Sequence, residues 1–170
     1  MNKITMLGTG NATVTQCYNT CFALQTDTTL LLVDGGGGNG VLAQLKRAGI
    51  AIADIHHLFV THAHTDHILG VIWMVRVFIQ RYLAGKYNGE LHVWSHAKVI
   101  HILRFNLGNM LTPKQFAEIG HCVFFHEVSE KDEIDCGSFH LQVFDILSTK
   151  EKQFGFTAEL PGDICLTCLG

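Results

Sequence analysis

The sequence has few charged residues and no excess of positive charge. Only 16% of its 170 residues are charged, with 12 Lys and Arg against 15 Asp and Glu, and the formal net charge is −3. Proteins that bind nucleic acid or acidic membranes usually carry a positive excess, because Lys and Arg neutralise phosphates and release their counterions. The overall charge therefore favours neither partner.

Long hydrophobic runs are also absent. The most apolar stretch, residues 68–79, is interrupted by Arg76 and is shorter than the roughly 20 residues that span a bilayer. The N-terminal MNKITMLGTG lacks the apolar core of a secretory signal. We therefore predict a cytoplasmic protein without a membrane segment. Because 48% of the residues are hydrophobic, we expect a single domain over residues 1–170 with one sizeable core.

Six cysteines are present, but their spacing predicts no disulfide framework. The cytosol keeps thiols reduced, and a structural zinc site needs four ligands at suitable spacing. Cys165 and Cys168 form a single CxxC, whereas Cys17 and Cys21 are further apart. We interpret the cysteines as thiols of the core.

Hydrophobic periodicity predicts a layered α/β fold. Strands at both ends of the chain enclose a helical middle, which is typical of such folds. Strands are expected at residues 3–7, 21–25, 29–33, 55–61, 91–94, 122–128, 139–146, 154–160 and 164–169, and helices at 41–48, 68–84, 98–107 and 113–119. Since the last residues, CLTCLG, are strand-like, we expect the sequence to stop inside the fold.

Four side chains that bind metals occur within six positions after a hydrophobic strand. Residues 61–67 read THAHTDH, which contains His62, His64, Asp66 and His67. Two imidazoles two residues apart on an extended loop can reach one cation, while the following carboxylate and imidazole turn toward a neighbouring position. These ligand types suit zinc, with manganese or iron as alternatives. Solvent-facing loop histidines are the simpler explanation, but such density is unusual for a loop.

The HxHxDH pattern resembles the metallo-β-lactamase superfamily. The segment LLLVDGGG at residues 30–37 supports the resemblance, and GTG at 8–10 and FGF at 154–156 are similar to its ribonuclease Z-like branch. The resemblance implies a four-layer αβ/βα sandwich with metal ions at one edge of two sheets. It covers the chain from its first residue to its last, although only HxHxDH is highly specific.

The resemblance also implies a role for each residue of the motif. His62 and His64 would bind a first zinc ion, and Asp66 and His67 a second. Asp66 would in addition be the catalytic residue that orients a metal-activated water. Asp34, which follows the second strand, would support the histidine loop; a simple turn aspartate is the alternative.

Two positions depart from the family pattern. A third metal-binding histidine is expected before FGF, but Ser148 or Thr149 occupies that place. The substitutes in this region, His121, His126 and His140, are not favoured, because a lone histidine is more often structural. A Gly-Asp pair is expected after the last strand, but the chain ends there at Gly170; Asp163 precedes that strand and is interpreted as a turn residue. We therefore expect the fold to lack its C-terminal part.

A glycine-rich segment, GGGGNG at residues 35–40, offers a competing interpretation. Its spacing satisfies GxGxxG after a strand, as in dinucleotide-binding proteins. Any glycine-dense run meets that spacing, and the P-loop lysine is missing. A nucleotide cofactor is therefore not favoured.

These observations together predict a metal-dependent hydrolase that cleaves an ester or phosphodiester bond of a small molecule. Nucleic acid is a less favoured substrate, because the net charge is negative and the short segment from Phe156 to Gly170 leaves no room for the arm that resembling enzymes use in tRNA 3′ processing. The alternative is a non-catalytic member that binds a metal or a partner. A homodimer is retained as an alternative to a monomer.

Overall fold

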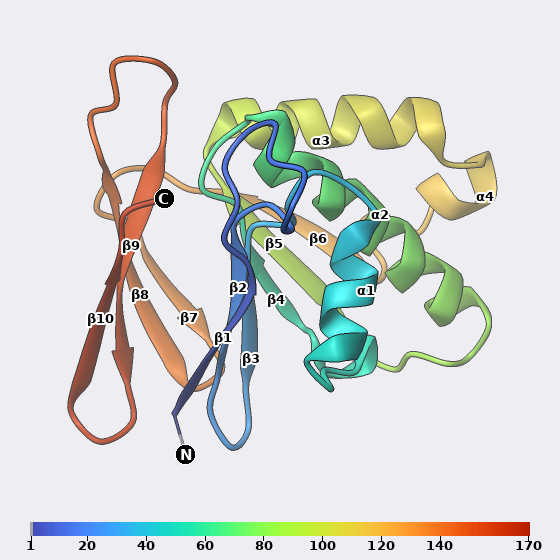
Figure 1. Cartoon of the computed structure of the whole chain (residues 1–170). Coiled ribbons are helices and arrows are strands. Elements are labelled where there is room, and N and C mark those ends of the chain that lie inside the picture. Colours follow the sequence, from blue (N-terminus) through green and yellow to red (C-terminus); the bar gives the residue numbers. More distant parts are fainter. Residues whose placement is uncertain (1) are drawn as a thin grey trace.

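The computed structural model describes residues 2–170 as two β-sheets and four α-helices (Figure 1). The first sheet has the order β1-β2-β3-β4-β5-β6, with bounds Lys3–Gly8, Cys21–Gln25, Leu30–Val33, His57–Phe59, Leu91–Ser95 and Val123–Glu127. The second has the order β10-β9-β8-β7, with bounds Ile164–Cys168, Phe154–Leu160, Phe139–Asp145 and Glu133–Cys136. The helices are α1 (Gly40–Arg47), α2 (Thr65–Leu83), α3 (Ala97–Met110) and α4 (Pro113–Phe116), with a 3₁₀ turn, η1, at Ile52–Asp54.

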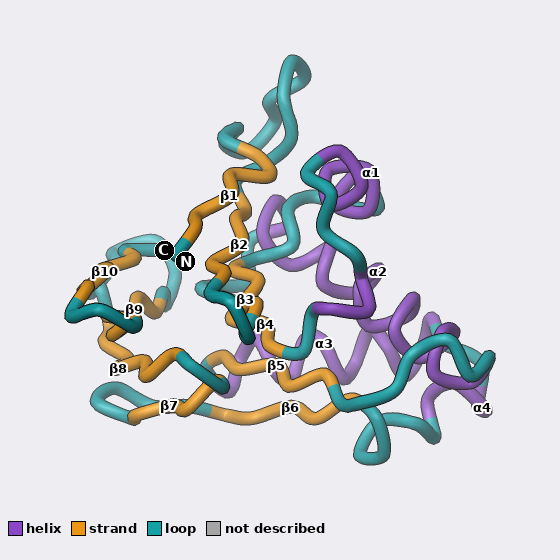
Figure 2. The backbone as a smooth tube through the Cα atoms, turned by 90° about the horizontal axis from the view of Figure 1, so that it is seen from below, coloured by secondary structure: helices purple, strands orange, loops and turns teal. Residues whose placement is uncertain are grey.

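The elements form three layers. The helices cover one face of the first sheet, and the second sheet packs against the other face (Figure 2). Strand β3 illustrates how the first sheet is buried on both faces. Leu30 and Leu32 belong to the core beneath the helices, while Leu31 and Val33 belong to the core between the sheets. A strand buried on both faces reads as a continuous hydrophobic run, because successive side chains point to opposite faces. Within residues 2–170 no helix covers the outer face of the second sheet.

Strands β3 to β6 run parallel and therefore end at the same edge of the first sheet. This edge brings together Asp34 after β3, the histidine loop after β4 and Ser95 at the end of β5. The Ser95 hydroxyl donates to the carbonyl of Val60 at 2.6 Å, and the amide of Asp34 donates to the carbonyl of Phe59 at 2.9 Å. Ligand sites of open α/β sheets form at such carboxyl ends.

Most predicted elements are present, with corrections at their ends. Helix α2 begins at Thr65 rather than at residue 68, so Asp66 and His67 lie in its first turn instead of on a loop. Strand β4 is shorter than expected and the helix expected at 113–119 ends at Phe116. Strand β7 was not predicted. None of the helices within residues 2–170 combines the length and apolar composition that a membrane span requires.

The glycine run packs against a helix. The carbonyl of Gly35 lies against Gly70 of α2, where an added Cβ would be only 1.8 Å from that oxygen. Two backbone hydrogen bonds of 2.9 Å, from Gly35 to the carbonyl of His67 and from Gly70 to that of Gly36, close the contact. This packing accounts for glycine at both positions without a bound phosphate.

Candidate metal centre

A buried carboxylate organises the histidine motif. Asp34 is only 3% exposed and has a φ of +59°. Its Oδ1 accepts the backbone N–H of Thr61, and its Oδ2 accepts the Thr61 hydroxyl and Nδ1 of His67, each at 2.8 Å. Asp34 thus supports the histidine loop, as predicted, by joining the end of β4 to the first turn of α2.

These hydrogen bonds determine which ring nitrogens are available. The single hydroxyl proton of Thr61 is donated to Asp34, so the hydroxyl accepts from Nδ1 of His62 at 2.9 Å. Nδ1 of His67 likewise donates to Asp34. When Nδ1 carries the proton, Nε2 of a neutral imidazole presents a lone pair. Both His62 and His67 therefore carry an unprotonated Nε2, and that of His62 accepts a hydrogen bond from Nδ1 of His64.

The four motif side chains lie close together as two pairs. Nε2 of His62 is 3.0 Å from Nδ1 of His64, and Nε2 of His67 is 3.7 Å from Oδ2 of Asp66. The rings of His62 and His67 have centroids 4.0 Å apart. Two imidazole nitrogens on one tetrahedral zinc are about 3.3 Å apart, given Zn–N bonds of about 2.0 Å. Both pairs thus have ligand-type atoms at a spacing close to that of a shared cation, and Nδ1 of His64 carries the proton of its hydrogen bond to His62. Within residues 2–170 no three His, Cys, Asp or Glu side chains form a group that can hold an ion.

Electrostatics favours the protonation states that metal binding requires at His62 and Asp66, but opposes the one required at His67. Burial, followed by the nearby His67, lowers the pKa of His62 to about 4, so this ring is neutral at pH 7. Burial alone would raise the pKa of Asp66, but the N–H of Ala12 and the neighbouring His67 lower it overall. For His67 burial acts downward, yet the hydrogen bond and charge of Asp34 raise its pKa. A bound cation would have to displace a proton there.

Comparison with known proteins shows the family to which the chain belongs. The family model described as anti-Pycsar protein Apyc1 matches residues 2–168, which includes the whole histidine motif. The chain belongs to the anti-Pycsar Apyc1 family. It is also 28% identical over 147 residues to a ribonuclease Z of Pyrococcus abyssi, an alignment that covers 86% of this chain and 44% of that enzyme. The chain spans less than half the length of the curated relatives it matches.

Solved structures confirm the predicted metallo-β-lactamase fold. The short form of human tRNase Z superposes with a TM-score of 0.75 at 18% identity, covering 100% of this chain and 68% of that one. The metallo-β-lactamase fold protein YhfI of Bacillus subtilis gives 0.73 at 15% identity, with 96% and 61% covered. This Apyc1-family chain thus has the fold that the resemblance implied, and its relatives include hydrolases.

The histidines weighed as a third ligand lie elsewhere. Nε2 of His126 is 2.9 Å from Nδ1 of His92 on the neighbouring strand, and Nδ1 of His140 is 2.8 Å from Asp135 in the second sheet. His121 is exposed beyond α4. Asp163 occupies the β9–β10 turn with a φ of +57°, in agreement with its interpretation as a turn residue.

Sequence reasoning missed a carboxylate near the motif. Glu151, in the loop that holds Ser148 and Thr149, accepts from Nζ of Lys98 at 2.9 Å through both oxygens. This bond is the main reason that the pKa of Glu151 is lowered, and His64 and His96 are close enough to contribute. No spacing rule in the sequence connects residue 151 to residue 64.

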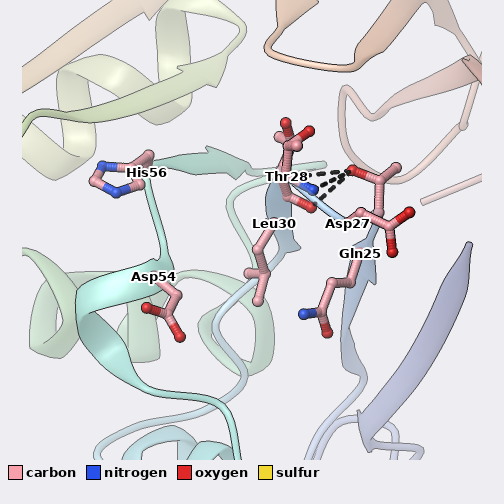
Figure 3. A pocket seen from close by; sticks show the side chains of 8 residues that line it. Gln25, Asp27, Thr28, Leu30, Asp54 and His56 are labelled. Carbon is pink, nitrogen blue, oxygen red and sulfur yellow. Dashed lines mark hydrogen bonds between the residues drawn. The ribbon is translucent and has the colours of Figure 1, made fainter. Parts of the chain in front are cut away.

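Two further features lie away from the motif. A pocket of about 330 Å³ lies at the β2–β3 turn, at the edge of the first sheet opposite the motif of residues 61–67. It is lined by Gln25, Asp27 and Thr28 with Asp54 and His56 (Figure 3). All six cysteines are free. Cys21, Cys122 and Cys136 are buried as predicted, but the expectation is wrong for Cys17 and Cys165, which are exposed in loop and edge-strand positions.

Proposed function

We propose that this Apyc1-family chain is a metal-dependent hydrolase that cleaves a phosphodiester or ester bond of a small molecule. Its ligands would be His62 and His64 for one zinc ion and Asp66 and His67 for a second, with manganese or iron as alternatives. The supporting observation is the Asp34–Thr61 network, which keeps the proton of both His62 and His67 on Nδ1 and leaves Nε2 of each unprotonated. Surface histidines without a ligand role have no need of such a network.

The chain's own residues would share the work of catalysis. When bound, zinc supplies a water acidic enough to act as a nucleophile at neutral pH. Asp66, which is ionised at that pH, would orient the attacking water and accept its proton. His62 and His64 would hold their ion from the end of β4, while Asp34 keeps the ring of His67 in one tautomer.

A small phosphodiester is the substrate class that we favour over RNA. The net charge of −3 provides little long-range attraction for a polyanion. The P. abyssi relative is named for a ribonuclease activity, so a structured RNA is the necessary comparison substrate. Cleavage of RNA but not of small phosphodiesters would overturn this choice.

Metal analysis and hydrolysis of bis(p-nitrophenyl) phosphate test the proposal. The purified chain should bind zinc or manganese and hydrolyse the ester, and His64→Ala should lower both affinity and rate by at least tenfold. His101→Ala is the matched control, because His101 is an exposed histidine on α3. A chain that binds no metal, or whose His64→Ala variant equals the His101→Ala variant, would refute the assignment.

The alternative is a non-catalytic metal-binding or partner-binding protein. It is favoured by Ser148 and Thr149 in the place of a third histidine and by the lack of a three-ligand group within residues 2–170. Full metal occupancy without hydrolysis of any ester or phosphodiester would support this alternative.

A further inference from the structure

The loop between β1 and β2 contacts the catalytic candidate directly. This loop, residues 9–20, lies beside the start of α2 (Figure 1). The backbone N–H of Ala12 donates to Oδ2 of Asp66 at 2.8 Å, across 54 positions of sequence. The same oxygen is the one that faces Nε2 of His67. The position of this loop amide therefore contributes to the orientation of the Asp66 carboxylate.

That amide is held in an unfavourable conformation. Ala12 has a φ of +38°, which L-residues other than glycine rarely adopt, so neighbouring contacts must maintain it. The contact that does so comes from Asn19, whose Nδ2 donates to the carbonyl of Ala12 at 2.9 Å. Asn19 thus holds the peptide group that follows the strained residue, while the N–H that precedes it donates to Asp66.

Asn19 is itself fixed against the rest of the site. A β-bridge joins it to Gly10, and its Oδ1 lies so close to Gly37 that an added Cβ there would be 2.5 Å away. The neighbouring Tyr18 hydroxyl shares its one proton between two carbonyls of the glycine run, at 2.8 Å from that of Gly35 and 2.7 Å from that of Gly38. The loop, the glycine run and α2 therefore form one connected unit.

From these contacts we infer that Asn19 is a positioning residue, which acts on Asp66 through the backbone of Ala12. The inference rests on the proposed metal-binding role of Asp66. A carboxylate that is held by a rigid donor loses less freedom when it binds a cation, and residues that orient metal ligands typically change metal affinity by about 10- to 100-fold when removed. Asn19→Ala should weaken zinc binding within that range.

The experiment measures zinc affinity by calorimetry and the exchange protection of the Ala12 amide by NMR. Asn19→Ala and the nearly isosteric Asn19→Asp, which cannot donate, should both lose affinity and amide protection. The matched control is Asn11→Ala, because Asn11 is exposed in the same loop and its side chain makes no hydrogen bond within residues 2–170. It should bind zinc as the wild type does. In an Asp66→Ala background, Asn19→Ala should have no further effect on affinity.

The outcomes separate this inference from the proposed function. If the wild type binds zinc and Asn19→Ala binds it equally well, the inference is overturned. An equal loss in the Asp66→Ala background would also overturn it, because Asn19 would then act by another route. If the wild type binds no zinc, the proposed function fails, and amide exchange at Ala12 still decides whether Asn19 holds the donor of Asp66.

Discussion

Replacing Asp34 with asparagine removes the charge of the buried carboxylate while keeping its shape. The φ of +59° at this position is tolerated by Asn as well as by Asp, so the backbone should not change. Oδ1 of the new amide can still accept the N–H of Thr61. Its NH₂ group, however, would face the Thr61 hydroxyl and Nδ1 of His67, both of which donate to Asp34 in the wild type.

The expected cost follows from these two lost hydrogen bonds. A hydrogen bond to a charged group contributes about 1.5–3 kcal/mol. We take the lower value for each, because the Thr61 hydroxyl can rotate and the cost of burying a charge is removed, which gives about 3 kcal/mol. For a domain of this size, that loss lowers the melting temperature by roughly 6–12 °C.

Asp34→Asn should also weaken metal binding by about 10- to 100-fold. An amide donor opposite Nδ1 of His67 favours the tautomer with its proton on Nε2, the nitrogen that faces Asp66. Urea unfolding and zinc titration measure the two effects. Asp163→Asn is the control, because Asp163 also has a positive φ, +57°, but lies in an exposed turn. Equal urea midpoints and zinc affinities for Asp34→Asn and the wild type would refute the reasoning.

Two further predictions concern stability. Burial, and then the neighbouring His92 and His56, lower the pKa of His57 to about 4. Between pH 6.5 and 4 the unfolded chain therefore binds more protons than the folded chain. The free energy of unfolding should fall as the pH falls through this window, by at most about 3 kcal/mol. His57→Phe should reduce this loss of stability between pH 7 and 4.5, as measured by urea unfolding. If the variant loses as much stability between these pH values as the wild type does, the prediction is wrong. Gly70→Ala would push a Cβ to 1.8 Å from the carbonyl of Gly35 and should cost about 1–3 kcal/mol. Gly38→Ala, with open space around its Cβ, should cost much less in the same urea assay, and equal losses would argue against the close packing.

Local patterns were sufficient to predict the layers and the position of the motif. The hydrophobic residues at 29–33 indicated a strand, and the structure places its side chains in two cores. The THAHTDH motif indicated ligands that begin at a strand end, which is where β4 and α2 meet. The metal-binding roles themselves stay predictions. Helix α2 was predicted to begin three residues too late, because ligand-type residues in its first turn interrupt the apolar pattern.

Contacts between distant segments were decided only by the tertiary structure. Parallel register stacks the rings of His57 and His92 and brings His92 to His126, although no spacing in the sequence relates these three residues. Long-range folding also brings Ala12 to Asp66 and Glu151 toward His64. The sequence by itself indicated the candidate cation ligands and the positions of most strands, because these depend on side-chain chemistry and short-range periodicity. Which side chains orient those ligands depends on strand register and loop packing, and these form only when the chain is folded.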